Sequence, residues 1–170
     1  MSCRHRSLLI VALLAIATPL PALQCETGLI AAHPDDSYLD HGDGSVSDRR
    51  SGLRWKRCAE GQAWDGNACT GTASTHTWAQ ALALAEAASF AGFDDWRLPN
   101  LKELHSLAET CRRLPAINDT LFPDVPGGYF WSSTPHRYYA ETSWVLGFAD
   151  GLGGVDLRSN DNHVRLVRGD

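Results

Sequence analysis

The first 22 residues constrain this chain more than any other feature, because they decide the compartment in which the rest of it folds. Arg4 and Arg6 come first, without an acidic residue, and residues 8–17 consist only of Leu, Ile, Val and Ala. A short segment of small residues and prolines then ends at Ala22, an order typical of a secretory signal peptide cleaved there. An uncleaved anchor is the alternative, but the apolar run is short for a bilayer span. We therefore expect a periplasmic or secreted protein with no membrane span after cleavage.

If the chain is exported, its cysteines are expected to form disulfides, because an oxidising compartment favours them. Removal of the signal takes Cys3 away and leaves an even number: Cys25, Cys58, Cys69 and Cys111. Cys58 and Cys69 flank the short Gly-rich segment 59–68 and are the expected local pair, which leaves Cys25 for Cys111. All three pairings of four cysteines stay open at this point. A Cys₄ zinc site is disfavoured, since zinc ligands usually lie about two to four residues apart.

Length and charge limit the organisation and the partners. A chain of 170 residues has room for one ordinary domain, and we divide it into the signal peptide 1–22, an N-terminal segment 23–36 and a domain 37–170. Acidic residues outnumber basic ones by 20 to 15, and the signal peptide carries none of the acidic ones. Nucleic-acid binding is therefore not expected, because it needs a basic field.

Two helix starts stand out in the middle of the chain. Thr77 with Gln80 forms a capping box before an Ala- and Leu-rich stretch, which predicts a helix over 78–91. Asn100 with Glu103 has the same spacing and predicts a second helix from Leu101 to about Thr110.

Strand patterns lie on both sides of these helices. Asp43-Gly44 and Asp150-Gly151 are hairpin signals between short strand-like runs. In residues 53–56 the alternation places Leu53 and Trp55 inward and Arg54 and Lys56 outward, and in residues 163–168 it places Arg165 outward. Together these features predict an α+β fold, loop-rich, with two helices packed on short antiparallel strands.

Seven segments in register carry a resemblance to a known family. They are residues 45–58, 77–85, 90–107, 115–123, 129–134, 143–151 and 164–169. The chain resembles the Lcl C-terminal domain family, named after the C-terminal domain of the Legionella collagen-like adhesin, over roughly residues 37–169. The resemblance implies a C-type-lectin-like fold, related to the formylglycine-generating sulfatase-modifying enzymes. It also implies a role in attachment, since that adhesin binds sulfated glycans and acts in biofilm formation. The collagen-like Gly-x-y stalk of the adhesin is missing here.

Catalysis is not expected. The formylglycine-generating relatives work through reactive thiols, whereas the four cysteines left after export are assigned to disulfides. The sequence also has no metalloprotease H-E-x-x-H, no G-x-S-x-G elbow and no phosphate-binding glycine loop. We therefore predict no catalytic residue, no cofactor and no metal ligand set.

Three groups of residues are candidate ligand contacts. The first is the densest basic cluster, suited to sulfate because arginine binds it in a bidentate manner; a solvated face is its alternative. The second is a pair of aromatic residues in a polar loop, and the third is a polar turn before the last strand, where C-type lectins hold calcium and sugar. The lectins' companion motif is missing, so a plain turn is the alternative. The groups are Arg49, Arg50, Arg54, Lys56 and Arg57; Tyr138 and Tyr139; Asn160 and Asp161. The tryptophans 55, 78, 96, 131 and 144 are expected in the core.

These observations favour an exported, non-catalytic binding module that serves adhesion or glycan recognition, with sulfated glycans as one option. The alternative is a structural or assembly protein of the cell envelope with no small ligand, and an enzyme related to the formylglycine-generating factors is the third hypothesis. The expected partner is a glycan or an envelope protein. The oligomeric state stays open.

Overall fold

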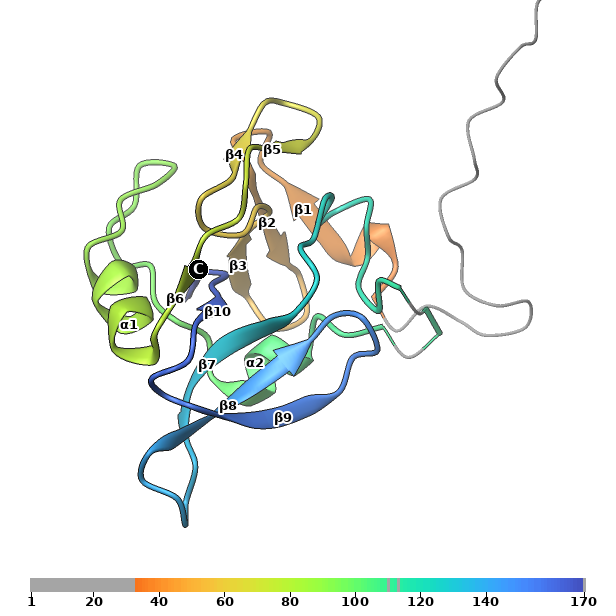
Figure 1. The fold of residues 1–170 in the computed structure, drawn as a ribbon. Coiled ribbons are helices and arrows are strands. Elements are labelled where there is room, and N and C mark those ends of the chain that lie inside the picture. The colour runs from red at the N-terminus through yellow and green to blue at the C-terminus, as the bar shows by residue number, and fades with distance from the viewer. Residues whose placement is uncertain (1–32, 110, 113, 170) are drawn as a thin grey trace, which may run out of the picture.

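The structure is a computed structural model that describes residues 33–169, except 110 and 113. The predicted signal peptide and Cys25 lie outside the described residues. Within the described part, short strands form three antiparallel or mixed sheets (Figure 1). No helix of this described part has the length and apolar character needed to cross a bilayer.

The first sheet has the strand order β1-β2-β3-β11 and is entirely antiparallel. The Asp43-Gly44 hairpin joins its first two strands, as predicted, and the end of the chain returns to pair with β3. Its strands are β1 (Tyr38–Asp40), β2 (Ser45–Asp48), β3 (Leu53–Lys56) and β11 (Val167–Gly169).

The second sheet has the order β6-β10-β7-β8-β9 and contains the longest strands. A register shift between Trp131 and Pro135 interrupts the β7–β8 pairing. The predicted Asp150-Gly151 hairpin joins β8 to the edge strand β9. The strands are β6 (Thr75–His76), β7 (Tyr129–Pro135), β8 (Thr142–Gly147), β9 (Gly153–Leu157) and β10 (Asn162–His163). A third, two-stranded sheet pairs β4 (Ala63–Trp64) with β5 (Cys69–Thr70).

The helices are shorter than the sequence suggested, and the prediction of two helices packed on short antiparallel strands was wrong, because the described part is mainly β. Both capping boxes form, but α1 spans only Trp78–Glu86 and α2 only Leu101–His105, a single turn and a half. After α2 the chain continues in i→i+3 turns, because Ala108 bridges to Ile117 instead of extending the helix. The described part is mainly β, with one helix of ordinary length.

Both faces of β7 and β8, in the second sheet, are covered. One face packs with α1 around Trp131, Val145 and Leu166. The other packs against the first sheet and α2 around Trp55, Phe130 and Leu146. The prediction of buried tryptophans is confirmed for Trp55, Trp96 and Trp131, whereas Trp78 and Trp144 are half-buried.

Candidate functional site

The basic segment does not form an open cationic surface. Arg54 is only 8% exposed, so the predicted outward position is wrong. Its Nη2 atom lies 2.7 Å from Asp43 Oδ2, its Nε donates to Ser45 Oγ at 2.8 Å, and its guanidinium carbon lies 4.8 Å from the centre of the Phe93 ring. A guanidinium held by these three groups has little capacity left for an external sulfate.

The next two cations of the segment are also used internally. Lys56 Nζ lies 2.5 Å from Glu60 Oε1 and over the Phe90 ring, and its side chain is 15% exposed. Arg57 is buried, pairs with Asp40 Oδ2 at 2.6 Å, donates to two backbone carbonyls and lies over the Trp64 ring. Burial raises the pKa of Asp40, but the Gly42 amide and Arg57 outweigh it and hold that pKa below its ordinary value.

Arg49 and Arg50 are the exposed members of the basic segment. Arg49 Nε donates to the Tyr38 carbonyl at 3.3 Å, and Arg50 lies beside Asp48 and contacts the His33 ring. Burial, followed by the Arg50 charge, lowers the pKa of His33. The structure therefore divides the predicted cluster into two exposed and three internally paired cations.

Two aromatic side chains cover this face of the first sheet, and they were not predicted from the sequence. Phe90 and Phe93, in the connection after α1, lie against the basic side chains of β3 and β11. Arg168, which pairs with Arg54 across the strands, lies 3.9 Å from the Phe93 ring centre and bonds to Asp95. Aromatic faces attract such cations. In the sequence, this cover is marked only by the two phenylalanines on either side of Ala91-Gly92. Ala91 and Gly92 adopt positive φ values in the structure.

The second predicted group lies at the tip of the β7–β8 hairpin, which extends away from the two sheets (Figure 1). Tyr138 and Tyr139 are 75% and 65% exposed. The His136 ring is stacked on Tyr139 at 5.0 Å with 8° between the planes, and it lies 5.6 Å from Trp144. We call His136, Tyr138, Tyr139 and Trp144 the tip aromatic cluster. It offers large, exposed ring faces on a hydrogen-bonded hairpin.

The third predicted group lies at the same end of the hairpin, beside the start of β8. The Arg158 amide donates to the Glu141 carbonyl at 2.8 Å, which places the turn after β9 next to the start of β8. Asn160 Nδ2 donates to Asp156 Oδ1 at 2.7 Å, and Asp161 is exposed. The structure thus brings the second and third groups to one end of the second sheet, and neither joins the basic segment. Among residues 33–169 as described, no group of three or more His, Cys, Asp and Glu side chains is placed to hold a metal ion.

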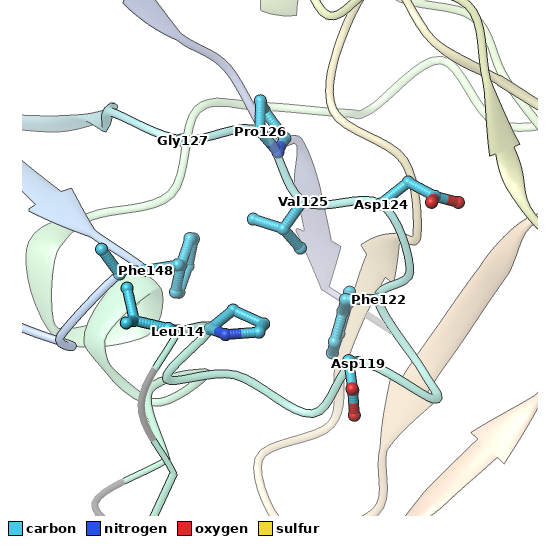
Figure 2. Close-up of a pocket in the computed structure, with 10 residues that line it drawn as sticks. Leu114, Asp119, Phe122, Asp124, Val125, Pro126, Gly127 and Phe148 are labelled. Atoms are coloured by element: carbon cyan, nitrogen blue, oxygen red, sulfur yellow. The ribbon is translucent and has the colours of Figure 1, made fainter. Parts of the chain in front are cut away.

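A pocket of about 390 Å³ opens at the other end of β8 (Figure 2). Its walls are apolar and come from the connection before β7 and from the two residues after β8. Asp119 and Asp124 stand at its edge; Asp119 pairs with Arg112 at 2.6 Å, and Asp124 Oδ2 accepts the Cys69 amide at 3.1 Å. The lining residues are Leu114, Pro115, Asp119, Phe122, Asp124, Val125, Pro126, Gly127, Phe148 and Ala149. No sequence pattern had indicated this pocket.

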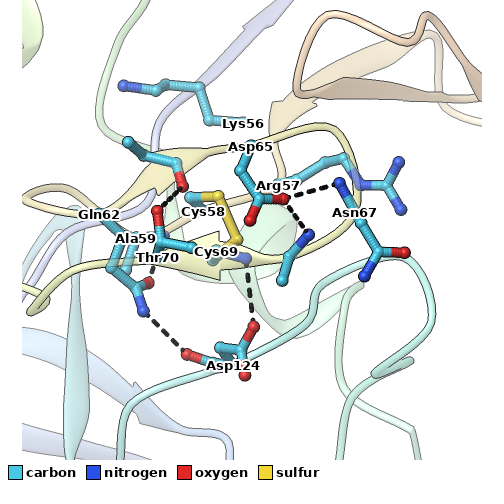
Figure 3. The surroundings of a disulfide bond; sticks show 12 residues. Lys56, Arg57, Cys58, Ala59, Gln62, Asp65, Asn67, Cys69, Thr70 and Asp124 are labelled. Atoms are coloured by element: carbon cyan, nitrogen blue, oxygen red, sulfur yellow. Dashed lines mark hydrogen bonds between the residues drawn. A yellow bond between two sulfur atoms is a disulfide. The ribbon is translucent and has the colours of Figure 1, made fainter.

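The predicted Cys58–Cys69 disulfide is confirmed (Figure 3). It closes the β4–β5 hairpin, whose turn is held by Asp65 through the Asn67 and Ala68 amides. These two amides lower the pKa of Asp65. Cys111 is disulfide-bonded as well; because Cys25 lies outside the described residues, the Cys25–Cys111 pairing stays a prediction.

Comparison with known families supports the resemblance seen in the sequence. Residues 44–168 match the sequence model of the family described as the Lcl C-terminal domain. A comparison with curated proteins finds no match.

Proposed function

Because the chain belongs to the Lcl C-terminal domain family, we propose that it is an exported, non-catalytic binding module that recognises glycans through the tip aromatic cluster. The exposure of Tyr138 and Tyr139 on an ordered hairpin is the observation that carries this proposal. Two large rings in solvent cost free energy unless a partner covers them, and a ring with an apolar face and a wet edge suits a sugar, which is built in the same way.

The geometry of the cluster favours stacking. The face-to-face contact with His136 fixes the orientation of the Tyr139 ring and leaves its other face toward the outside. Hydrogen bonds support the backbone beneath it: the Tyr139 amide donates to His136 Nδ1 at 3.2 Å, and the Thr142 amide donates to the Tyr139 carbonyl at 3.0 Å. A preorganised ring loses little conformational freedom when a ligand binds.

The basic segment argues for neutral rather than sulfated glycans. Its three central cations, Arg54, Lys56 and Arg57, already bond to carboxylates within the fold. Attraction to a polyanion would also be screened over about 8 Å at physiological salt. A neutral sugar that stacks on tyrosine needs none of these charges, so its binding changes little as salt rises.

Export and the absence of catalysis belong to the same proposal. The Cys58–Cys69 disulfide fits an extracellular or periplasmic location. It also occupies two of the thiols that a formylglycine-generating type of reaction would need. Purified, oxidised protein is therefore expected to turn over no thiol peptide substrate in the presence of copper or oxygen.

The test is a glycan array followed by calorimetry on the best neutral oligosaccharide. Tyr139→Ala should weaken binding about tenfold, which is the value of one stacked ring. Tyr129→Ala is the matched control, because Tyr129 is a half-exposed tyrosine on β7 outside the cluster. Wild-type protein that binds only sulfated glycans, or neutral glycans equally well after Tyr139→Ala, would rule the proposed site out.

A second function has one observation in its favour. The edge strand β9 carries exposed Val155 and Leu157, with Leu152 just before it. An apolar edge strand is suited to pairing with another protein. A structural or assembly role in the envelope, without a small ligand, is therefore the alternative. A pull-down from envelope extract with wild type and Leu152→Lys distinguishes the two, since exposed Leu152 lies before β9, at the end of the strand remote from the tip aromatic cluster.

A further inference from the structure

Two features at opposite ends of the β7–β8 pair complement each other in shape and charge. The first is the tip, where Arg137 and Tyr138 protrude into solvent; we call these two residues the knob. Tyr138 is 75% exposed, and the Arg137 guanidinium lies 5.3 Å from the centre of its ring. Among the described residues, Arg137 has no ion-pair partner. The knob is thus an aromatic ring with an uncompensated positive charge beside it.

The second feature is the apolar pocket beyond the far end of β8. Leu114, which forms part of its edge, is 76% exposed, while Phe122 and Phe148 are buried in its floor and wall (Figure 2). In the part of the chain that the structure describes, Asp124 has no cationic partner either. Its carboxylate is directed away from the floor, toward the Cys69 amide. The pocket therefore combines apolar walls with an uncompensated negative charge at its rim.

The knob cannot enter the pocket of its own chain. β8 begins beside the tip at Thr142 and ends at Gly147, one residue before Phe148 in the pocket wall. A strand of this length separates its ends by about 20 Å. In Figure 1 the tip and the connection before β7 accordingly lie at different ends of the molecule.

We propose that the knob of one copy docks into the pocket of a second copy, so that the protein self-associates head to tail. The pocket, at about 390 Å³, lies at the lower end of the range of ligand-binding cavities and accepts a single aromatic side chain. Docking removes both the Tyr138 ring and the apolar walls from water and brings Arg137 toward Asp124. Aromatic residues and arginine are the usual anchors of protein interfaces.

A head-to-tail contact uses different surfaces on the two partners and so leaves one knob and one pocket free on every pair. Such contacts continue into chains unless the rotation closes a ring. This inference goes beyond the proposed glycan binding and does not depend on it. The knob shares Tyr138 with the tip aromatic cluster, so a partner copy and a bound sugar would compete for this exposed ring.

The first experiment is sedimentation velocity on the disulfide-bonded protein without sugar, from low micromolar to millimolar concentration. The wild type should show concentration-dependent association. Tyr138→Ala should weaken it about thirtyfold or more, as expected for a central interface anchor. Arg137→Glu should also weaken the association. Its control is Lys102→Glu, because Lys102 is exposed on α2 and the change in charge is equal.

A conservative variant tests the pocket rim. Asp124→Asn removes the charge but keeps a side-chain oxygen for the Cys69 amide, and asparagine tolerates the positive φ at this position. If Arg137 approaches Asp124, the losses caused by Arg137→Glu and Asp124→Asn are not additive in a double-mutant cycle. Additive losses would overturn the proposed pairing.

A mixing experiment tests the polarity of the contact. The knob variant Arg137→Glu/Tyr138→Ala retains a pocket, and the pocket variant Leu114→Arg retains a knob; the exposure of Leu114 makes this change tolerable for folding. Each variant alone should be monomeric, while an equimolar mixture should form one-to-one dimers and nothing larger. A wild type that stays monomeric at millimolar concentration, or association that survives either variant, would overturn the inference and leave the pocket to another occupant.

Discussion

Arg54 and Asp43 are joined by a 2.7 Å ion pair across the hairpin at the start of the first sheet. The arginine comes from β3 and the aspartate from the β1–β2 turn, and Phe93 covers the guanidinium from outside. What reads along the sequence as a basic patch is therefore part of the internal support of this sheet. Its substitution should change stability before it changes any binding.

The first prediction follows from this pair. Arg54→Ala removes the ion pair with the Asp43 carboxylate, the hydrogen bond to the Ser45 hydroxyl and the cation–π contact with a phenylalanine ring. It should therefore lower the free energy of unfolding by about 2 kcal/mol. Urea unfolding followed by tryptophan fluorescence measures this. Arg49→Ala is the control, because Arg49 is exposed and should change stability by no more than about 0.5 kcal/mol. Equal effects of the two substitutions would contradict the structural role of Arg54.

The second prediction concerns the disulfide. Replacing both Cys58 and Cys69 by serine frees a loop with a sequence separation of 11 and should cost about 3 kcal/mol in the chain-entropy account. Reduction of the wild-type protein should cost at least as much, because it also breaks the disulfide of Cys111. Non-reducing peptide mapping of exported protein must first show the linkage; free thiols at both positions would contradict it and reopen thiol or metal chemistry.

The third prediction is a pH dependence at the start of α2. Glu103 accepts two bonds of 2.8 Å from Arg97 and caps the helix through the Asn100 amide. Burial raises the pKa of Glu103, but these partners outweigh it and lower that pKa below its ordinary value. The ionised form therefore adds stability that is complete above the unfolded pKa, about 4.3, and disappears as pH falls through the lower folded pKa.

Glu103→Gln isolates this effect, because glutamine also completes a capping box. At neutral pH the variant should be less stable than the wild type by about 1 kcal/mol, a modest value because Arg97 is largely exposed. The difference should close as pH is lowered through the folded pKa. Urea midpoints of both proteins at several acidic pH values measure this, and a difference that stays constant down to about pH 2 would contradict it.

Local features of the fold could be predicted because their causes are local. The Thr77–Gln80 capping box starts α1 at Trp78, and the Asp43-Gly44 turn produces the β1–β2 hairpin. The ends of the helices and the orientation of side chains could not be predicted in this way, because residues distant in the sequence determine them. α2 ends at His105 because Ala108, three residues later, pairs with Ile117 in an antiparallel bridge and cannot continue the helix.

The site residues show the same division. Tyr138 and Tyr139 were predicted to be exposed from the polar loop around them, and they are. Arg54 was expected outward from strand alternation alone, which assumes that one face of the strand is solvated. Here the other face of β3 is covered by Phe90 and Phe93, which lie more than thirty residues away along the chain. No pattern within β3 predicts this cover.

The last prediction concerns Arg165, for which alternation also failed. Its side chain is fully buried between the Phe122 and Phe130 rings. Nη1 donates to the Lys56 carbonyl at 2.9 Å and to the Arg57 carbonyl, while Nε and Nη2 have no acceptor. Burial lowers the pKa of Arg165 to about 9, with Glu60 opposing it in part. A buried cation held by neutral carbonyls contributes packing and hydrogen bonds at the cost of desolvation.

Arg165→Met should therefore change the free energy of unfolding by less than about 1.5 kcal/mol, because methionine refills the space between the rings. Arg165→Ala should cost about 3 kcal/mol, because it leaves a cavity as well. The folded pKa of Arg165 lies below the unfolded one, so the unfolded chain binds more protons above about pH 9, and the stability of the wild type should rise there relative to Arg165→Met. Urea unfolding of all three proteins at about pH 8 and about pH 10 measures both effects. Two results would show that the guanidinium is better compensated than its contacts indicate. One is a stability difference between wild type and Arg165→Met that is the same at both pH values. The other is an Arg165→Met variant that is as unstable as Arg165→Ala.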